Sequence, residues 1–140
     1  MSSPIFELLG IGNPIMDIIA QVDDDFLRQH VAGEKGGMVL VDDADIARLL
    51  TNLGSAVAMA PGGSAANAVL GATKLGLRTT YVGKTGGDKT AEDYRANFIS
   101  AGGDGGRFKR TNLPNGRCLS MVTPDGQRTM NTYLGAAGEV

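Results

Sequence analysis

Residues 61–84 read PGGSAANAVLGATKLGLRTTYVGK. Two glycines open an alanine-rich run over residues 64–75 that is typical of a helix, and Gly76 is placed to end that helix. Residues 79–84 then have the composition of a strand. Small residues along the helix permit close packing on a sheet. A helix that leads directly into a strand predicts the α/β class, with a parallel sheet.

Further along the chain in both directions, the same alternation continues. We expect strands at 5–11, 15–22, 38–41, 117–123 and 128–134, a brief extended piece at 57–60, and helices at 23–30, 42–53 and 90–101. The turn at 124–126, Pro-Asp-Gly, makes 117–134 a hairpin. Because this hairpin and the strands at 15–22 and 38–41 do not alternate with helices, they predict a small second sheet over the first.

Composition excludes several functional classes. The chain has 140 residues, 42% hydrophobic and 20% charged, with a net charge of -2, which is ordinary for one globular domain. We therefore expect no nucleic-acid or membrane partner. Cys118 is the single cysteine, so no disulfide forms within the chain and a cytoplasmic location is expected. Residues 1–10 do not resemble a signal peptide.

The first candidate motif is residues 10–17, GIGNPIMD. A strand ends in a glycine turn, and Asn13 and Asp17 follow four residues apart. Ligands of open α/β sheets bind at the carboxyl ends of strands. An amide together with a carboxylate can hold neighbouring hydroxyl groups of a sugar. The alternative is an ordinary Asn-Pro turn with Asp17 in solvent.

The second candidate motif is the glycine pair before the alanine-rich helix. Gly62 and Gly63 let a ligand approach the backbone, and the free N–H groups of the helix start, at Ser64, can bind oxygen atoms. Asn67 is a polar residue on an otherwise small, apolar helix and needs a partner. A plain glycine-rich turn before a buried helix is the alternative.

The third candidate is Arg128, just after the hairpin turn. An arginine there can stabilise charge on a transferring phosphoryl group, although a solvated turn arginine is the simpler reading. We interpret Cys118 as a small buried hydrophobic residue. His30 stands alone, so no metal site is expected.

Together these motifs resemble the PfkB family of carbohydrate and nucleoside kinases over essentially the whole chain. The most specific match is GGSAAN at 62–67, and GNPIMD at 12–17 is similar to the opening of adenosine kinases. Residues 117–136 resemble a bacterial branch of these kinases. The resemblance implies a ribokinase-like α/β/α sandwich with a small β-sheet lid, its strands near 15–22, 37–41 and 117–132.

The resemblance also implies an activity and a site. The intact protein would transfer a phosphoryl group from ATP, with Mg²⁺, to a primary hydroxyl of a nucleoside or sugar. Substrate hydroxyls would contact residues of the first two motifs, and Arg128 would approach the transferred phosphate. The substrate-binding set is Asn13, Asp17, Gly62, Gly63, Ser64 and Asn67.

One family feature is missing from the sequence. The Gly-Ala-Gly-Asp signature, which supplies the catalytic base in the family, is absent, and family members are longer. We therefore expect that the 140 residues are an N-terminal part that ends at Val140, lacks the ATP-binding part and is inactive alone. Alternatives are a ribokinase- or fructokinase-type sugar kinase and a non-catalytic sugar-binding or dimerisation module.

The choice between nucleoside and sugar depends on the lid. A nucleoside base needs an apolar slot, which Ile15, Met38, Leu40 or Leu134 could line, whereas a simple sugar needs more polar residues there. In the family the lid often builds a dimer interface, so a homodimer through the lid is a further expectation.

Overall fold

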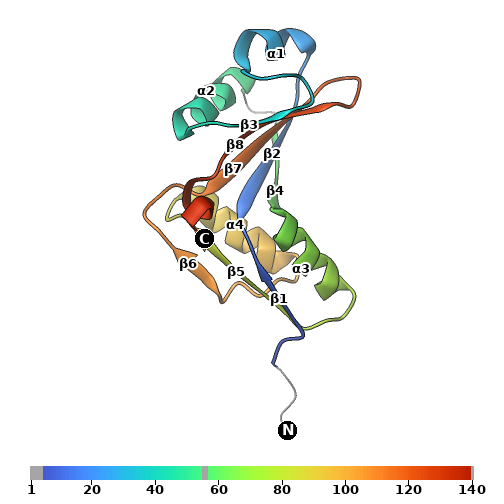
Figure 1. The fold of residues 1–140 in the computed structure, drawn as a ribbon, viewed down its shortest axis with the longest axis vertical. Helices are drawn as coiled ribbons and strands as arrows, with labels where there is room; N and C mark the ends of the chain where they lie inside the picture. Colours follow the sequence, from blue (N-terminus) through green and yellow to red (C-terminus); the bar gives the residue numbers. More distant parts are fainter. Residues whose placement is uncertain (1–4, 55–56, 140) are drawn as a thin grey trace.

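The computed structural model describes residues 5–54 and 57–139, and over these residues the chain folds into two sheets with helices packed on them (Figure 1). The strands are β1 Leu8–Ile11, β2 Ile15–Gln21, β3 Met38–Leu40, β4 Val57–Gly62, β5 Thr79–Thr85, β6 Phe108–Arg110, β7 Gly116–Val122 and β8 Arg128–Tyr133. The helices are α1 Asp24–His30, α2 Asp43–Leu53, α3 Ser64–Lys74, α4 Lys89–Ser100 and the 3-10 helix η1 Gly135–Glu139. The expected chain end at Val140 lies outside the described residues. So do residues 1–4 of the stretch 1–10, which was expected not to be a signal peptide.

The first sheet has the strand order β1-β5-β6, and all its strands are parallel. Helix α4 connects β5 to β6, which is the βαβ arrangement that the alternating pattern predicts, and α3 leads from β4 into β5 and packs on β1 and β5. The α/β class is confirmed. The short strand β6 was not predicted, because three residues after a glycine-rich loop carry no readable periodicity.

The second sheet has the order β3-β8-β7-β2-β4 and joins the segments expected there. β7 and β8 form the antiparallel hairpin, β2 runs parallel to β7, and β3 runs parallel to β8. β4 also belongs to this sheet, antiparallel to β2, although its sequence indicates only a short extended piece before the glycine pair. This pairing carries the chain from the second sheet directly into α3.

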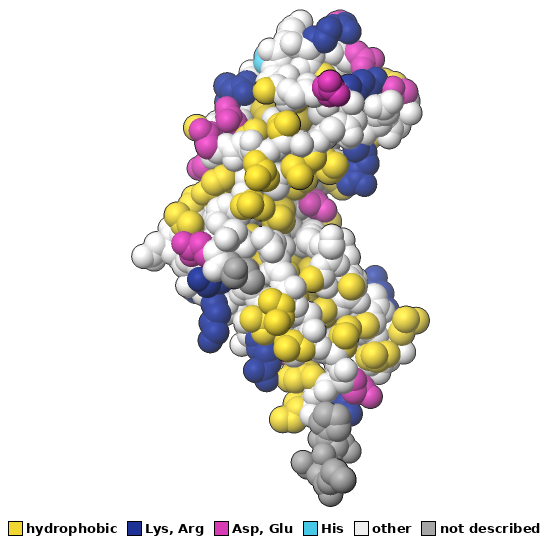
Figure 2. Space-filling view, in the orientation of Figure 1, with side chains coloured by type: hydrophobic (Ala, Val, Ile, Leu, Met, Phe, Trp, Pro, Cys, Tyr) yellow, Lys and Arg dark blue, Asp and Glu magenta, His cyan; other side chains and the backbone are white. Residues whose placement is uncertain are grey.

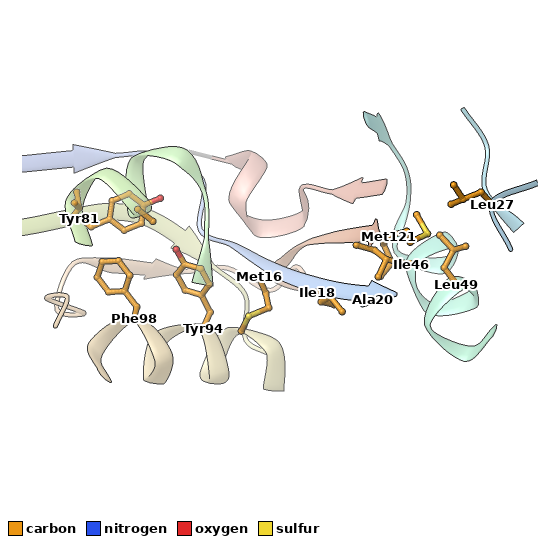
Figure 3. Close-up of a cluster of buried hydrophobic side chains, with 13 residues drawn as sticks. Met16, Ile18, Ala20, Leu27, Ile46, Leu49, Tyr81, Tyr94, Phe98 and Met121 are labelled. Atoms are coloured by element: carbon orange, nitrogen blue, oxygen red, sulfur yellow. The ribbon is translucent and has the colours of Figure 1, made fainter. Parts of the chain in front are cut away.

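Each face of the second sheet has a different role. Alternation along β2 points Met16, Ile18 and Ala20 into the core and Ile15 and Asp17 to the opposite face. On the core face, α1 and α2 add buried leucine and isoleucine side chains (Figure 3). The same cluster continues into the first sheet through aromatic rings. Its aromatic members are Tyr81, Tyr94, Phe98 and the partly buried Phe108.

Aspartates begin three of the helices. The Asp23 carboxylate accepts a hydrogen bond from the backbone N–H of Phe26 at 2.7 Å and so caps α1. Asp42 and Asp88 cap α2 and α4 in the same way. These bonds satisfy N–H groups that a helix start otherwise leaves free.

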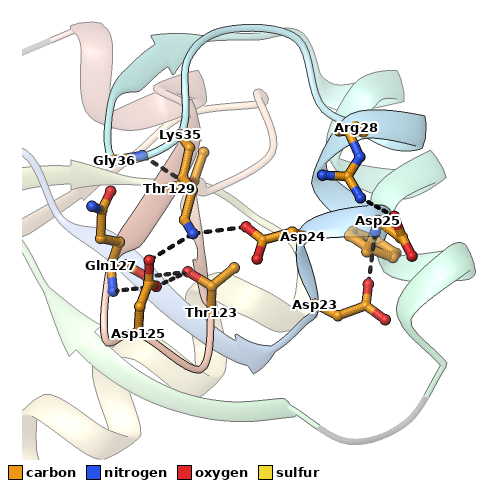
Figure 4. A network of polar contacts seen from close by, with 11 residues as sticks. Asp23, Asp24, Asp25, Arg28, Lys35, Gly36, Thr123, Asp125, Gln127 and Thr129 are labelled. Atoms are coloured by element: carbon orange, nitrogen blue, oxygen red, sulfur yellow. Dashed lines mark hydrogen bonds and ion pairs between the residues drawn. The ribbon is translucent and has the colours of Figure 1, made fainter.

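A charged cluster ties the hairpin tip to α1 (Figure 4). The Lys35 ammonium group lies 2.7 Å from a carboxylate oxygen of Asp24 in α1 and 2.7 Å from one of Asp125 in the hairpin turn. Beside it, the backbone N–H of Gly36 donates to Thr129 Oγ1 at 2.9 Å. We call the Lys35, Asp24 and Asp125 contacts the lysine clasp.

Asn115 lies where the chain passes from the first sheet into the second. Its fully buried side chain accepts from the N–H of Gly86 at 3.1 Å and donates to the carbonyl oxygens of Pro14 and Gly116 at 3.4 and 3.0 Å. Pro14 precedes β2 and Gly116 begins β7. One amide therefore joins two of the segments that connect the sheets.

Candidate functional site

Two neighbouring cavities open between the second sheet and the start of α3. One has a volume of about 400 Å³ and the other about 380 Å³. They share Ile15, Gly63 and Ser64 in their walls. On one face of the molecule, hydrophobic side chains gather over its middle, and many charged side chains lie toward its upper end (Figure 2).

The larger cavity has a polar side and an apolar side. Asp17, Ser64 and Asn67 provide the polar groups, and they come from β2 and α3. The four apolar residues that the sequence suggested for a slot all line this cavity: Ile15, Met38, Leu40 and Leu134. Met38 and Leu40 are 55% and 62% exposed, so this apolar wall is open to a ligand.

Asp17 is the half-buried acid of the larger cavity. Burial raises the pKa of its carboxyl group, and the charge of Arg128 acts in the opposite direction. Within the described residues, no side chain or backbone group donates a hydrogen bond to this carboxylate. Its oxygens are therefore free to accept hydrogen bonds from a ligand.

Gly62 makes room for Asp17. A side-chain carbon placed on Gly62 would overlap the Asp17 carboxylate, so the acid lies against bare backbone. Gly62 is paired with Ile15 across β4 and β2, and it is the last residue of β4. Gly62 lines neither cavity, and it acts as the wall behind the acid.

The smaller cavity contains Asn13, together with Gly12 and Ala65. Gly63, between the cavities, has a φ of +101°, and a side chain there would collide with the carbonyl oxygen of Asn13. Gly63 also caps α3 without any side-chain hydrogen bond. The first N–H groups of α3 are therefore not satisfied by a capping side chain and lie at the cavity wall.

Arg128 lies on the same face of the second sheet but lines neither cavity. Its Nε donates to Ser120 Oγ at 3.2 Å. The structure thus brings Asn13, Gly63 and Ser64 around one cavity and Asp17 and Asn67 around the adjoining one. The charge of Arg128 acts on the larger cavity, where it lowers the pKa of Asp17 and of Cys118 against the effect of burial.

Sequence reasoning missed three residues of the larger cavity, Cys118, Met130 and Thr132. Cys118 was expected to be buried, yet it is only partly buried and lies opposite Asp17 in the β2–β7 register. Burial raises the pKa of its thiol, so it stays protonated at neutral pH. Only the pairing of distant strands could have placed these residues in the site.

Two further properties concern cofactors and membranes. Over residues 5–54 and 57–139, no three His, Cys, Asp or Glu side chains come close enough to hold a metal ion. In the same part of the chain, no helix has the length and apolar character that crossing a bilayer requires.

Comparison with known proteins now adds to this geometry. Residues 33–140 match the family model described as pfkB family carbohydrate kinase. "Adenosine kinase 2" of Arabidopsis thaliana is 30% identical over 135 residues, which are 93% of this chain and 38% of that protein.

Two solved structures have the same fold over nearly the whole chain. Adenosine kinase from Sinorhizobium meliloti is 37% identical with a TM-score of 0.83, over 98% of this chain and 42% of that one. A probable sugar kinase from Rhizobium etli CFN 42 is 33% identical with a TM-score of 0.82, over 96% and 41%. The 140 residues therefore span about two fifths of the length of these relatives.

Proposed function

Because this chain belongs to the pfkB family of carbohydrate kinases, we propose that the intact protein uses ATP to phosphorylate the primary hydroxyl of a nucleoside, with adenosine the first choice. The observation that carries this proposal is the two-sided character of the larger cavity. A nucleoside has a polar ribose and a flat, largely apolar base, and the cavity offers a carboxylate on one side and exposed Met38 and Leu40 on the other.

We assign the residues as follows. The carboxylate of Asp17 accepts hydrogen bonds from ribose hydroxyls, and Asn67 and Ser64 contact the same sugar. Asn13 and Gly63 form the neighbouring wall. Arg128 turns from Ser120 to the transferred phosphate, where a guanidinium group stabilises the charge.

ATP supplies the phosphoryl group, and Mg²⁺ neutralises its charge. Since the 140 residues span about two fifths of the relatives' length, we assign both groups, and the base that deprotonates the acceptor hydroxyl, to the rest of the intact protein. The chain alone should then bind acceptor and not phosphorylate it. A homodimer through the second sheet and a cytoplasmic location stay predictions.

A sugar kinase is the second candidate, and one observation favours it. The smaller cavity, lined by Asn13 and Ser64, has no large apolar wall apart from Ile15, and a ribose or hexose would suit it. The 33% identity to a probable sugar kinase is consistent with this alternative.

Calorimetric titration of the 140-residue chain with adenosine, ribose and fructose tests the proposal. We expect adenosine to bind most tightly. Leu40→Ala should weaken adenosine binding and leave ribose binding unchanged, because only the base contacts the apolar wall. The control is Leu75→Ala, a change of an 83% exposed leucine at the far end of α3. Preference for ribose or fructose would establish the sugar kinase instead.

Activity is a separate measurement. The full-length gene product should phosphorylate adenosine with ATP, and the 140-residue chain should not. Activity in the short chain would contradict the assignment of the base to a missing part. Binding without activity in the full-length protein would favour the non-catalytic module.

A further inference from the structure

Tyr94 connects helix α4 to the wall behind Asp17. The side chain is fully buried, and its hydroxyl donates a hydrogen bond to the carbonyl oxygen of Gly62 at 3.0 Å. Figure 3 shows Tyr94 beside Met16, at the boundary between the aromatic cluster and β2. No motif in the sequence singles out this tyrosine.

The bond acts on the backbone that bounds the acid. The Asp17 carboxylate occupies the space where Gly62 would carry a side chain, so the position of the Gly62 backbone sets the room available to the acid. Gly62 is also the last residue of β4 before the chain turns into α3 through Gly63, whose φ is +101°. A segment at such a junction has fewer regular backbone bonds than a strand interior, so a side-chain bond contributes more to fixing it.

Tyr81 provides an internal comparison. Its ring is also fully buried in the same aromatic cluster, and its centroid lies 5.5 Å from that of the Phe98 ring. The centroids of the Tyr94 and Phe98 rings lie 6.2 Å apart. The Tyr81 hydroxyl, however, has no hydrogen-bond partner among the described residues. Two tyrosines in one cluster therefore differ in whether the hydroxyl holds a part of the site.

We propose that Tyr94 is a positioning residue for the acceptor site: its hydroxyl holds the Gly62 carbonyl and thereby fixes the wall against which the Asp17 carboxylate lies. The residue itself touches no substrate. It acts only through Gly62 and Asp17, and α4 thus controls the geometry of a site that it does not line. The choice of adenosine as ligand rests on the proposed function. The role of Tyr94 in placing Gly62 and Asp17 does not depend on it.

The first test compares Tyr94→Phe with Tyr81→Phe. Tyr94→Phe should weaken adenosine binding about fivefold, the equivalent of one ordinary hydrogen bond. Tyr81→Phe should leave it unchanged. In an Asp17→Ala background Tyr94→Phe should have no further effect, because the residue acts through that acid. Thermal unfolding of each variant, without ligand, verifies that it is folded.

The second test needs no ligand, so it separates this inference from the proposed function. Nuclear magnetic resonance titration follows the Asp17 carboxyl, which is faced by Arg128 from β8, Cys118 from β7 and Tyr94 from α4. Release of Gly62 should let water reach Asp17, and its raised pKa should fall toward the ordinary value in Tyr94→Phe only.

Each result has a definite meaning. A fall in the Asp17 pKa in Tyr94→Phe, without any adenosine binding by the wild type, would support the positioning role and overturn the nucleoside assignment. Equal behaviour of Tyr94→Phe and Tyr81→Phe in the titration would overturn the positioning role. The positioning role would also be overturned if Tyr94→Phe reduced adenosine affinity by the same factor in the wild type and in Asp17→Ala.

Discussion

The carboxylate of Asp17 lies in the space that a side chain on Gly62 would occupy. The two residues lie on the neighbouring strands β2 and β4, where Gly62 pairs with Ile15 and Asp17 with Ala60, so they are diagonal neighbours from segments more than forty positions apart in the chain. The pair explains why a glycine stands at the end of β4, where neither a positive φ nor a tight turn requires it at that residue. Position 62 requires glycine because any side chain there would overlap the Asp17 carboxylate.

Gly62→Ala should therefore damage the site. The added methyl group overlaps the Asp17 carboxylate, and overpacking of this kind costs about 1–3 kcal/mol. We expect adenosine affinity, measured by calorimetry, to fall about tenfold. Gly71→Ala is the matched control in α3, because a side chain there meets open space, and alanine should stabilise the helix by ~0.5–1 kcal/mol. Equal affinities for the two variants would contradict the proposed steric relationship.

Asp17→Asn should stabilise the unliganded protein at neutral pH while it weakens ligand binding. Burial raises the pKa of Asp17, so the folded state holds its proton to a higher pH than the unfolded state does. The acid therefore costs stability above its folded pKa, and the cost vanishes below the ordinary carboxyl pKa, where both states are protonated. The melting temperature should rise at pH 7 and match the wild type near pH 3.

Asp125→Asn provides the opposite sign in the same experiment. Hydrogen bonds from Lys35, Thr123 and the Gln127 backbone lower the pKa of Asp125 to about 2. Its ionised form therefore stabilises the fold above the ordinary carboxyl pKa, and this contribution is lost as the pH falls through about 2. Asp125→Asn should lower the melting temperature at pH 7. A fall for both variants at pH 7 would refute the assignment of Asp17 as a desolvated acid.

Local features of this fold could be predicted from the sequence, and long-range ones could not. The cap of α1 by Asp23 and that of α4 by Asp88 depend on residues three positions away, so the pattern alone indicates them. The glycine pair before α3 is equally local. The α/β class follows from the order of elements, because that order is itself a property of the sequence.

The contents of the larger cavity depend on register instead. Cys118 lies opposite Asp17 only because β2 and β7 pair in parallel with that alignment, and a shift of one residue would point it to the core face. The role of Asn115 likewise requires Pro14 and Gly86 to meet, although they come from distant segments. The hydrophobic periodicity of the sequence does not indicate these contacts between distant segments.

Asn115→Ala should destabilise the protein strongly. The change leaves the N–H of Gly86 and the carbonyl oxygens of Pro14 and Gly116 without their buried side-chain partner. Unsatisfied buried groups cost about 1–3 kcal/mol each, so we expect a loss of roughly 3 kcal/mol in urea unfolding. Asn112→Ala, in an exposed loop, is the control and should change the unfolding free energy by less than ~0.5 kcal/mol. Similar losses for both would show that Asn115 does not join the two sheets.

Lys35→Met should weaken the lysine clasp in a salt-dependent way. The lysine lies 2.7 Å from both Asp24 and Asp125, and these carboxylates raise the pKa of its ammonium group, so at neutral pH the clasp is fully charged. Without it, α1 and the hairpin turn lose their electrostatic contact (Figure 4), and the melting temperature should fall in dilute buffer. At 1 M salt the Debye length is about 3 Å, and the difference from wild type should shrink. Lys89→Met removes a pair with Asp93 within α4 alone and should have a smaller effect, since it joins no separate segments. An unchanged difference at high salt would show that the lysine acts through packing of its alkyl chain and not through its charge.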